Sequence, residues 1–151
     1  MTAQKIRLAE IADIYEILLI EQQSFDITND RNKTEILKAI KAKKIYVFVN
    51  DIDVVGYIWL DINEKKKVAY IQSLAVGNAF RRKGYGEKLF AFAVDLINDR
   101  GILKAALHVY TNNKGAIKLY KKYGFMKTDF IENRYGNNQN AYCMEKEFYE
   151  D

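Results

Sequence analysis

Residues 81–86 read Arg81-Arg82-Lys83-Gly84-Tyr85-Gly86, and they separate a strand-like run, residues 68–76, from a helix-like run. Two glycines at this spacing let backbone N–H groups approach an anion closely. The helix that follows would direct the positive end of its dipole at the same point, and the three cations add further positive charge. The stretch therefore predicts a site for a phosphorylated ligand, most simply a pyrophosphate, where a strand passes into a helix.

Hydrophobic periodicity on both sides of this loop predicts the remaining elements. The expected helices are residues 9–23, 34–42, 86–98 and 113–123. The expected strands are residues 45–49, 54–61, 68–76, 103–110, 125–132 and 141–148. In the first helix, the apolar face would be formed by Ile11, Ile14, Tyr15, Leu18 and Leu19. The order predicts an α+β fold with about four helices and a mixed, mostly antiparallel sheet of six or seven strands, with a strand-helix-strand crossover inside it.

The composition limits the class of protein. The chain has 151 residues, 49% of them hydrophobic, which suits one domain over residues 1–151 that buries roughly 70% of the surface of the unfolded chain. A formal net charge of +4 suits an anionic ligand, although Lys65-Lys66-Lys67 and Lys121-Lys122 are more simply solvated ends of elements. A single cysteine, Cys143, and a single histidine, His108, exclude an intrachain disulfide and a zinc site of the usual ligand count. Acidic residues in the first helix argue against a signal peptide or a membrane span, and we expect a cytoplasmic protein.

Other common sites are excluded by spacing. Leu89 stands where a dinucleotide-binding fingerprint needs a third glycine or alanine, and no Gly-Lys-Ser/Thr P-loop occurs. There is no Gly-x-Ser-x-Gly elbow, and the stretch from His108 to Tyr110 lacks the glutamate of a zinc deaminase. Cys143 lies in the last expected strand, as a buried structural thiol would. Covalent catalysis therefore has no obvious nucleophile.

An ordered set of motifs from about Tyr70 onwards resembles the GNAT family of acetyl-CoA-dependent N-acetyltransferases. The set comprises Leu74-Ala75-Val76, the loop 81–86, Asn113, Ala116-Ile117-Lys118-Leu119-Tyr120 and Gly124-Phe125. The resemblance implies a GNAT-like fold in which the loop holds the pyrophosphate of acetyl-CoA and the preceding strand holds the pantetheine and polarises the thioester carbonyl. It also implies that Asn113 contacts the cofactor and that Tyr120 protonates the leaving thiolate. The cofactor-binding residues so implied are Leu74, Ala75, Val76, Arg81, Arg82, Lys83, Gly84, Tyr85, Gly86, Asn113 and Tyr120.

Within that family, two stretches resemble the N-terminal protein acetyltransferases of the ribosomal-protein-alanine type and their relatives. They are Ala69-Tyr70-Ile71-Gln72-Ser73-Leu74 and Leu107-His108-Val109. The resemblance implies that Tyr70 and His108 take the amine proton through ordered water, and that Phe25 and Tyr135 bind the acceptor. The chain departs from those enzymes in three respects. The bacterial enzymes carry a glutamate at the place of His108, the paired tyrosines before the last strand are reduced to Arg134-Tyr135, and no proline follows Phe25.

The chemistry of the residues agrees with a base at His108. An amine attacks a thioester only when neutral, so a proton must be removed while an oxyanion is stabilised. The histidine pKa of about 6.5 lies near the ~7.7 to 8.0 of an α-amine, whereas a lysine amine near 10.4 is much harder to deprotonate. Alternation along strand 103–110 places His108 on its more polar face. On the residues alone, His108 could equally be a structural histidine, Tyr70 a packing residue and Tyr120 part of a core stripe.

We therefore predict an acetyl-CoA-dependent N-acetyltransferase, acting by direct transfer in a ternary complex on a peptide N-terminal α-amine. A small amine, such as a polyamine, an amino sugar or an amino-acid derivative, is the alternative acceptor. A non-catalytic acyl-CoA-binding or RNA-associated module is a third interpretation, because 24 Lys plus Arg and 19 Tyr plus Phe could bind and stack on RNA. Most of those aromatic residues fall on expected apolar faces. We accordingly expect no nucleic acid, no membrane and no metal, and a monomer or homodimer.

Overall fold

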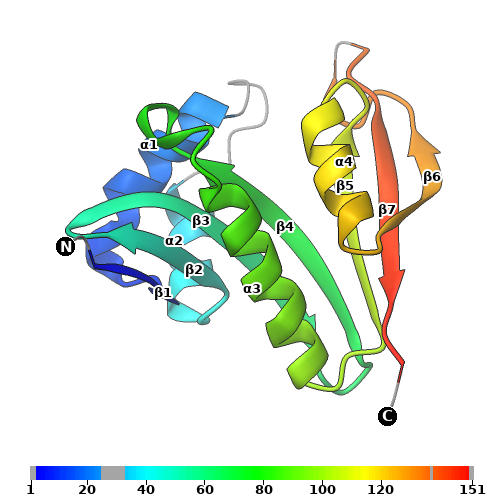
Figure 1. Cartoon of the computed structure of the whole chain (residues 1–151), viewed down its shortest axis with the longest axis horizontal. Helices are drawn as coiled ribbons and strands as arrows, with labels where there is room; N and C mark the ends of the chain where they lie inside the picture. The colour runs from blue at the N-terminus through cyan, green and yellow to red at the C-terminus, as the bar shows by residue number, and fades with distance from the viewer. Residues whose placement is uncertain (1–2, 25–32, 137, 150–151) are drawn as a thin grey trace. The chain divides into compact units, whose positions relative to one another are not determined.

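The computed structural model of the chain describes residues 3–24, 33–136 and 138–149, and Figure 1 shows its elements in chain order. The elements are β1 (Gln4–Leu8), η1 (Ile11–Asp13), α1 (Ile14–Ser24), α2 (Lys33–Lys41), β2 (Ile45–Asn50), β3 (Asp53–Asn63), β4 (Val68–Val76), η3 (Asn78–Phe80), α3 (Tyr85–Asp99), β5 (Lys104–Tyr110), α4 (Lys114–Lys122), β6 (Met126–Ile131) and β7 (Ala141–Glu147). The strands form one sheet in the order β1-β2-β3-β4-β5-β7-β6. The described residues thus confirm the expected α+β fold, with four α-helices and a mostly antiparallel seven-stranded sheet.

The chain divides into two compact units, and the first comprises residues 1–60 and 73–92. Its strands are antiparallel: β1 pairs with β2 from Gln4 opposite Asn50, and β2 pairs with β3 from Ile45 opposite Trp59. Isoleucines and valines from α1, α2 and β2 bury their side chains in its core, around the fully buried ring of Tyr57. Branched aliphatic residues suit this packing because they fill the space between a helix layer and a pleated sheet.

The second unit comprises residues 61–72 and 93–151. The first half of β4 pairs with β5 in parallel, from Val68 opposite Lys104 to Ile71 opposite Leu107. Strand β5 is antiparallel to β7, and β7 is antiparallel to β6, so that these three strands stand side by side (Figure 1). Along β5 every second residue is buried, which confirms the alternation expected from the sequence and leaves His108 on the half-exposed face.

The N-terminal elements differ from the expectation in two ways. The strand β1 was not expected, and the predicted helix 9–23 starts with the short η1 before α1 begins at Ile14. The expected apolar face of this helix is wrong in part, because Ile11, Tyr15 and Leu19 are 55%, 68% and 55% exposed. The buried row is instead Ile14, Ile17, Ile20 and Glu21. Because Glu21 belongs to the buried row, an assignment of the buried face from hydrophobicity alone selects the wrong residues.

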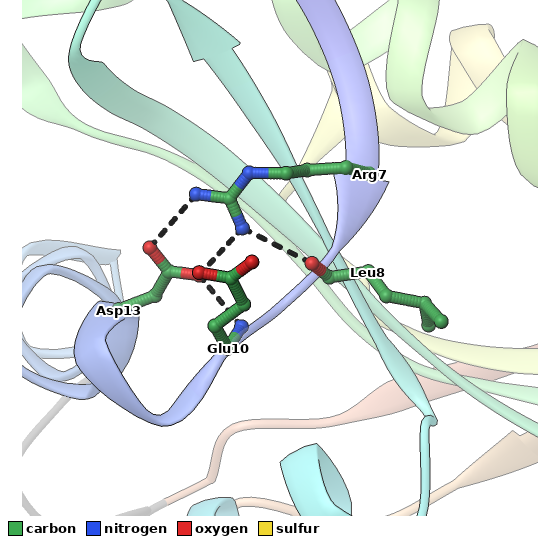
Figure 2. Close-up of polar contacts among 4 residues, drawn as sticks. All are labelled: Arg7, Leu8, Glu10 and Asp13. Carbon is green, nitrogen blue, oxygen red and sulfur yellow. Dashed lines mark hydrogen bonds and ion pairs between the residues drawn. The ribbon is translucent and has the colours of Figure 1, made fainter.

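A charged cluster joins β1 to η1 (Figure 2). Arg7 donates through Nη1 to Asp13 Oδ2 at 2.8 Å and through Nη2 to Asp13 Oδ1 at 3.1 Å, while the backbone N–H of Glu10 donates to Asp13 Oδ2 at 2.7 Å. Burial by itself would raise the pKa of Asp13, but these hydrogen bonds and the charge of Arg7 outweigh it and lower that pKa. The pairing explains why Asp13 can be buried at the start of the helix.

Two further features bear on the class of protein. Among the described residues, no helix is both long and apolar enough to cross a membrane. Across residues 3–24, 33–136 and 138–149, no cluster of histidine, cysteine and acidic side chains is arranged to hold a metal ion. Cys143, expected as a buried thiol, is half-buried in β7.

Candidate active site

The glycine-containing loop lies in the first unit, between β4 and α3. Gly84 has a φ of +84° and Arg82 a φ of +62°, so the chain turns sharply twice before the helix begins. The first bond of the helix runs from Lys88 N–H to the Gly84 carbonyl at 3.1 Å. The N–H groups of Tyr85 and Gly86 belong to the first turn, where backbone N–H groups have no acceptor within the helix and are directed beyond its end. A Cβ added to Gly84 would meet no atom within 4 Å. The loop is therefore an open N-terminal helix end, the geometry that binds phosphate groups.

Two loop side chains that were expected at the ligand are used within the protein. The ring of Tyr85 is buried, and its centroid lies 4.8 Å from that of the Phe48 ring. Its hydroxyl oxygen accepts a hydrogen bond from Asn50 Nδ2 at 3.3 Å. Arg81 donates through Nε to the Val76 carbonyl at 3.1 Å. The Tyr85 side chain is therefore packed in the core of the first unit, whereas Arg81 makes its hydrogen bonds as an exposed residue. Arg82 and Lys83 have exposed side chains and supply the positive charge.

The end of β4 leads into this loop. Ala75 is buried, whereas Leu74 and Val76 are half-buried on the other face of the strand. Gly56 of β3 approaches β4 so closely that an added Cβ would lie 2.9 Å from the Ala75 carbonyl oxygen and 3.1 Å from Leu89 Cδ1. A glycine is needed at that point because any side chain would push the strand and helix apart.

The second unit contains the two residues expected to take the amine proton. The Tyr70 hydroxyl is hydrogen-bonded to His108 Nδ1, and the two rings meet edge to face at 5.3 Å between centroids. When Nδ1–H donates to the phenol oxygen, Nε2 is left as the proton acceptor. Burial lowers the pKa of His108, and the positive charge of Arg134 lowers it further, while Asp129 opposes the shift. The imidazole is therefore mainly neutral near pH 7, as a base must be.

Three tyrosines lie at the end of β5, in α4 and in the loop before β7: Tyr110, Tyr120 and Tyr135. Burial raises the pKa of Tyr120 to about 12, and Tyr135 adds to the shift. The Tyr135 ring meets the Tyr110 ring edge to face, with 6.5 Å between the centroids, and Arg134 Cζ lies over the Tyr135 ring, 5.6 Å from its centroid. Asn113 caps α4, because its Oδ1 accepts the backbone N–H of Ala116 at 3.2 Å. The cap leaves the Asn113 amide N–H groups as donors for a ligand.

The structure thus brings together Tyr70 and His108, and places Tyr135 against Tyr110. Phe25, expected to bind the acceptor, lies outside the described residues. Sequence reasoning missed the charges of Asp129 and Arg134 acting on His108, because no local pattern connects a residue of β5 with a residue of β6 or of the loop after it. It also missed the contacts of Gln23 with the loop, for which the sequence carries no signal.

Three protein relatives show what the chain is similar to. A model of the acetyltransferase (GNAT) family matches residues 11–125. The chain is 31% identical to the N-acetyltransferase san of Drosophila melanogaster, over 89% of this chain and 76% of that protein. It is 31% identical to a Bacillus subtilis protein named as a ribosomal protein bS18-alanine N-acetyltransferase, over 89% of this chain and 87% of the relative. A third relative is an uncharacterised N-acetyltransferase of the same bacterium, to which the chain is 32% identical over 55% of its own length. That match spans about half, 54%, of the relative.

Solved structures agree with this similarity. Ard1 from Thermoplasma volcanium superposes with a TM-score of 0.87 at 32% identity, over 98% of this chain and 99% of the other. Arabidopsis thaliana Naa50, solved with the bisubstrate analogue CoA-Ac-MVNAL, superposes with a TM-score of 0.83 at 27% identity, over 96% and 99% of the two chains.

Proposed function

This chain belongs to the GNAT family of acetyltransferases, and from that premise we propose that it acetylates the α-amine of a protein or peptide N-terminus, using acetyl-CoA. Two of the proteins to which it is similar support this acceptor: one is named as a bS18-alanine N-acetyltransferase, and the other, Naa50, was solved in complex with the bisubstrate analogue CoA-Ac-MVNAL. The observation that carries the proposal is the hydrogen bond between Tyr70 and His108. The whole chain, residues 1–151, would act as one acetyltransferase domain.

The acyl donor would be held by the loop and by the end of β4. The open helix end at Gly84, with N–H groups that have no helical acceptor, fits a pyrophosphate, and Arg82 and Lys83 supply charge beside it. Backbone groups of residues 74–76 would bind the pantetheine and polarise the thioester carbonyl. The amide N–H groups of Asn113 would add a further contact to the cofactor.

The proton of the amine would leave through His108. A neutral imidazole with Nδ1 bound to Tyr70 presents Nε2 to the acceptor or to a water between them. An α-amine suits this base because its pKa of ~7.7 to 8.0 lies much closer to that of histidine than a lysine pKa of about 10.4 does. The neutral amine would then attack the thioester directly in a ternary complex.

The leaving thiolate would be met by Tyr120. A phenol with a pKa of about 12 stays protonated throughout the physiological range and so keeps the proton of a hydrogen-bond donor. A thiol has a pKa of about 8.5, so a phenol with a higher pKa does not give up its proton to the thiolate permanently. The phenol would instead stabilise the thiolate through a hydrogen bond, and the thiolate would finally take its proton from solvent. Tyr120→Phe would then lower turnover and leave acetyl-CoA affinity nearly unchanged.

The experiment that tests the proposal measures thiol release from acetyl-CoA with three matched acceptors. The first is a short peptide that has a free N-terminus and an internal lysine. The second is the same peptide with its N-terminus blocked, so that the lysine is its only amine. The third is a polyamine or an amino sugar. We expect release with the free N-terminus and none above background with the blocked peptide. Thiol release with the polyamine or amino sugar alone would mean that the acceptor is a small amine and not a peptide N-terminus. Thiol release with the blocked peptide, whose lysine is the acceptor, would contradict the argument that the base suits an amine of low pKa.

A further inference from the structure

The last turn of α1 holds the loop that follows β4. Gln23 Oε1 accepts the backbone N–H of Asn78 at 2.9 Å. Arg81 Nη2 donates to the Gln23 carbonyl at 3.3 Å and to Ser24 Oγ at 3.1 Å. Arg81 Nε donates at the same time to the Val76 carbonyl, so one guanidinium joins the helix end to the strand end. Every one of these contacts lies within the first unit.

The same turn of α1 is itself fixed in the core. Glu21 is buried, and its Oε2 accepts the hydroxyl of Tyr57. The Tyr57 oxygen also lies 2.8 Å from Ser73 Oγ, and since the phenol proton goes to the carboxylate, Ser73 donates to it. A buried carboxylate keeps such partners because leaving it unpaired is costly. Gln23 therefore extends from a turn whose position is set by β3 and β4.

The loop needs support from outside its own residues. Arg82, which is not a glycine, has a φ of +62°, and Gly84 follows at +84°, so the backbone passes twice through a region that side chains disfavour. Such a conformation persists only where surrounding contacts hold it. A loop that is held in its binding conformation before the ligand arrives binds more tightly, because less ordering remains to be done.

We propose that Gln23 is a positioning residue for the acyl-donor loop, acting through the N–H of Asn78. The hydrogen bond keeps the start of the loop against α1, so that the open helix end at Gly84 is already formed when the pyrophosphate of acetyl-CoA binds. This inference rests on the proposed function, in which that loop is the donor site. It adds a residue of the first helix, distant in sequence from the loop, to the determinants of donor affinity.

Two variants remove the hydrogen bond from opposite sides. Gln23→Met keeps the length of the side chain and the helix propensity but removes the acceptor oxygen. Asn78→Pro removes the donor, and the backbone tolerates it, because Gly77 is extended with φ −60° and ψ 147° and Asn78 is the first residue of η3. The controls are Gln22→Met, the same change on the neighbouring exposed residue, and Asn78→Ala, which keeps the N–H.

The measurement is the Kd of coenzyme A by calorimetry, with the KM for acetyl-CoA and kcat alongside, on variants whose thermal midpoints match the parent. Gln23→Met and Asn78→Pro should each weaken binding about threefold to tenfold, the worth of one hydrogen bond, with kcat unchanged. The double variant should bind coenzyme A no more weakly than the single variant with the higher Kd, because both substitutions remove the same hydrogen bond.

Three outcomes would overturn the inference: coenzyme A binding by Gln23→Met equal to the parent, Asn78→Pro indistinguishable from Asn78→Ala, or multiplicative effects in the double variant. A parent protein that does not bind coenzyme A would instead remove the proposed donor site, and the inference with it.

Discussion

His108 should titrate below the ordinary histidine range, and Arg134 should be one cause of it. Burial is the larger influence on this pKa, and the positive charge of Arg134 acts in the same direction, against Asp129. Replacing Arg134 by Gln removes a charge that disfavours the imidazolium, so the pKa of His108 should rise. Asp129→Asn should lower it. Arg100→Gln removes an equal charge from a residue paired with Glu64 and is the matched control.

The chain contains one histidine, so its imidazole can be followed by NMR without assignment ambiguity once any expression tag is removed. The parent midpoint should lie below about 6.5, which means that more than half of the imidazole is neutral at that pH. The acid limb of kcat/KM should move with the NMR midpoint from variant to variant. The ionisation of the amine substrate is common to all of them, so a shift between variants belongs to the enzyme.

The size of the catalytic effect follows from the role of a general base. His108→Ala should lower turnover about 10²-fold to 10⁴-fold near pH 7 and leave coenzyme A binding nearly unchanged. Unchanged turnover in that variant would exclude His108 as the base. A parent midpoint above 6.5 would refute the account in which burial and Arg134 lower the pKa of His108, and so would an Arg134→Gln midpoint equal to that of the control.

Other features give predictions that a single variant pair can check. Gly84→Asn should retain coenzyme A binding measured by calorimetry, because asparagine tolerates positive φ, whereas Gly84→Asp should weaken it more than about tenfold by placing an anion beside phosphate. Gly56→Ala should cost about 1–3 kcal/mol of unfolding free energy in urea, while Gly115→Ala, at an open helical site, should gain about 0.5–1 kcal/mol. Asp13→Asn should cost about 1–3 kcal/mol at pH 7 by urea titration. Because the folded-state pKa of Asp13 is lowered by Arg7 and its neighbours, the stabilisation is present above pH ~4 and lost as the pH falls through the folded-state pKa, so the two proteins should converge in acid.

Local chemistry explains what could be predicted. The open helix end at residues 81–86 depends on glycines, on the cations beside them and on the strand-to-helix order, all of which are adjacent in the chain. The alternation that placed His108 on the half-exposed face of β5 is likewise a local property, confirmed by the burial of Leu107 and Val109 on the other face. The family resemblance rested on motifs of the same local kind, and the match over residues 11–125 confirms it.

Contacts between distant segments account for the errors. The exposed face of η1 and α1 was expected to be buried because Ile11, Tyr15 and Leu19 are apolar. The buried row instead includes Glu21, and the hydrogen bond from Tyr57, on a strand far along the chain, offsets the cost of burying that carboxylate. Strand β1 is short and carries Lys5 and Arg7, so its pairing with β2 has no strong local signal.

By itself, the sequence determined the order of the helices and of the strands after β1, the place of the glycine-containing loop and the residue types available for chemistry, because these depend on neighbours within a few positions. Only the tertiary structure decided how those residues are used. It turned Arg81 into a link between β4 and α1, buried Tyr85 against Phe48, and joined His108 to Tyr70. A side chain with several donors or acceptors binds whichever partner the fold brings within reach, and that partner is set by packing between segments that the local sequence does not encode.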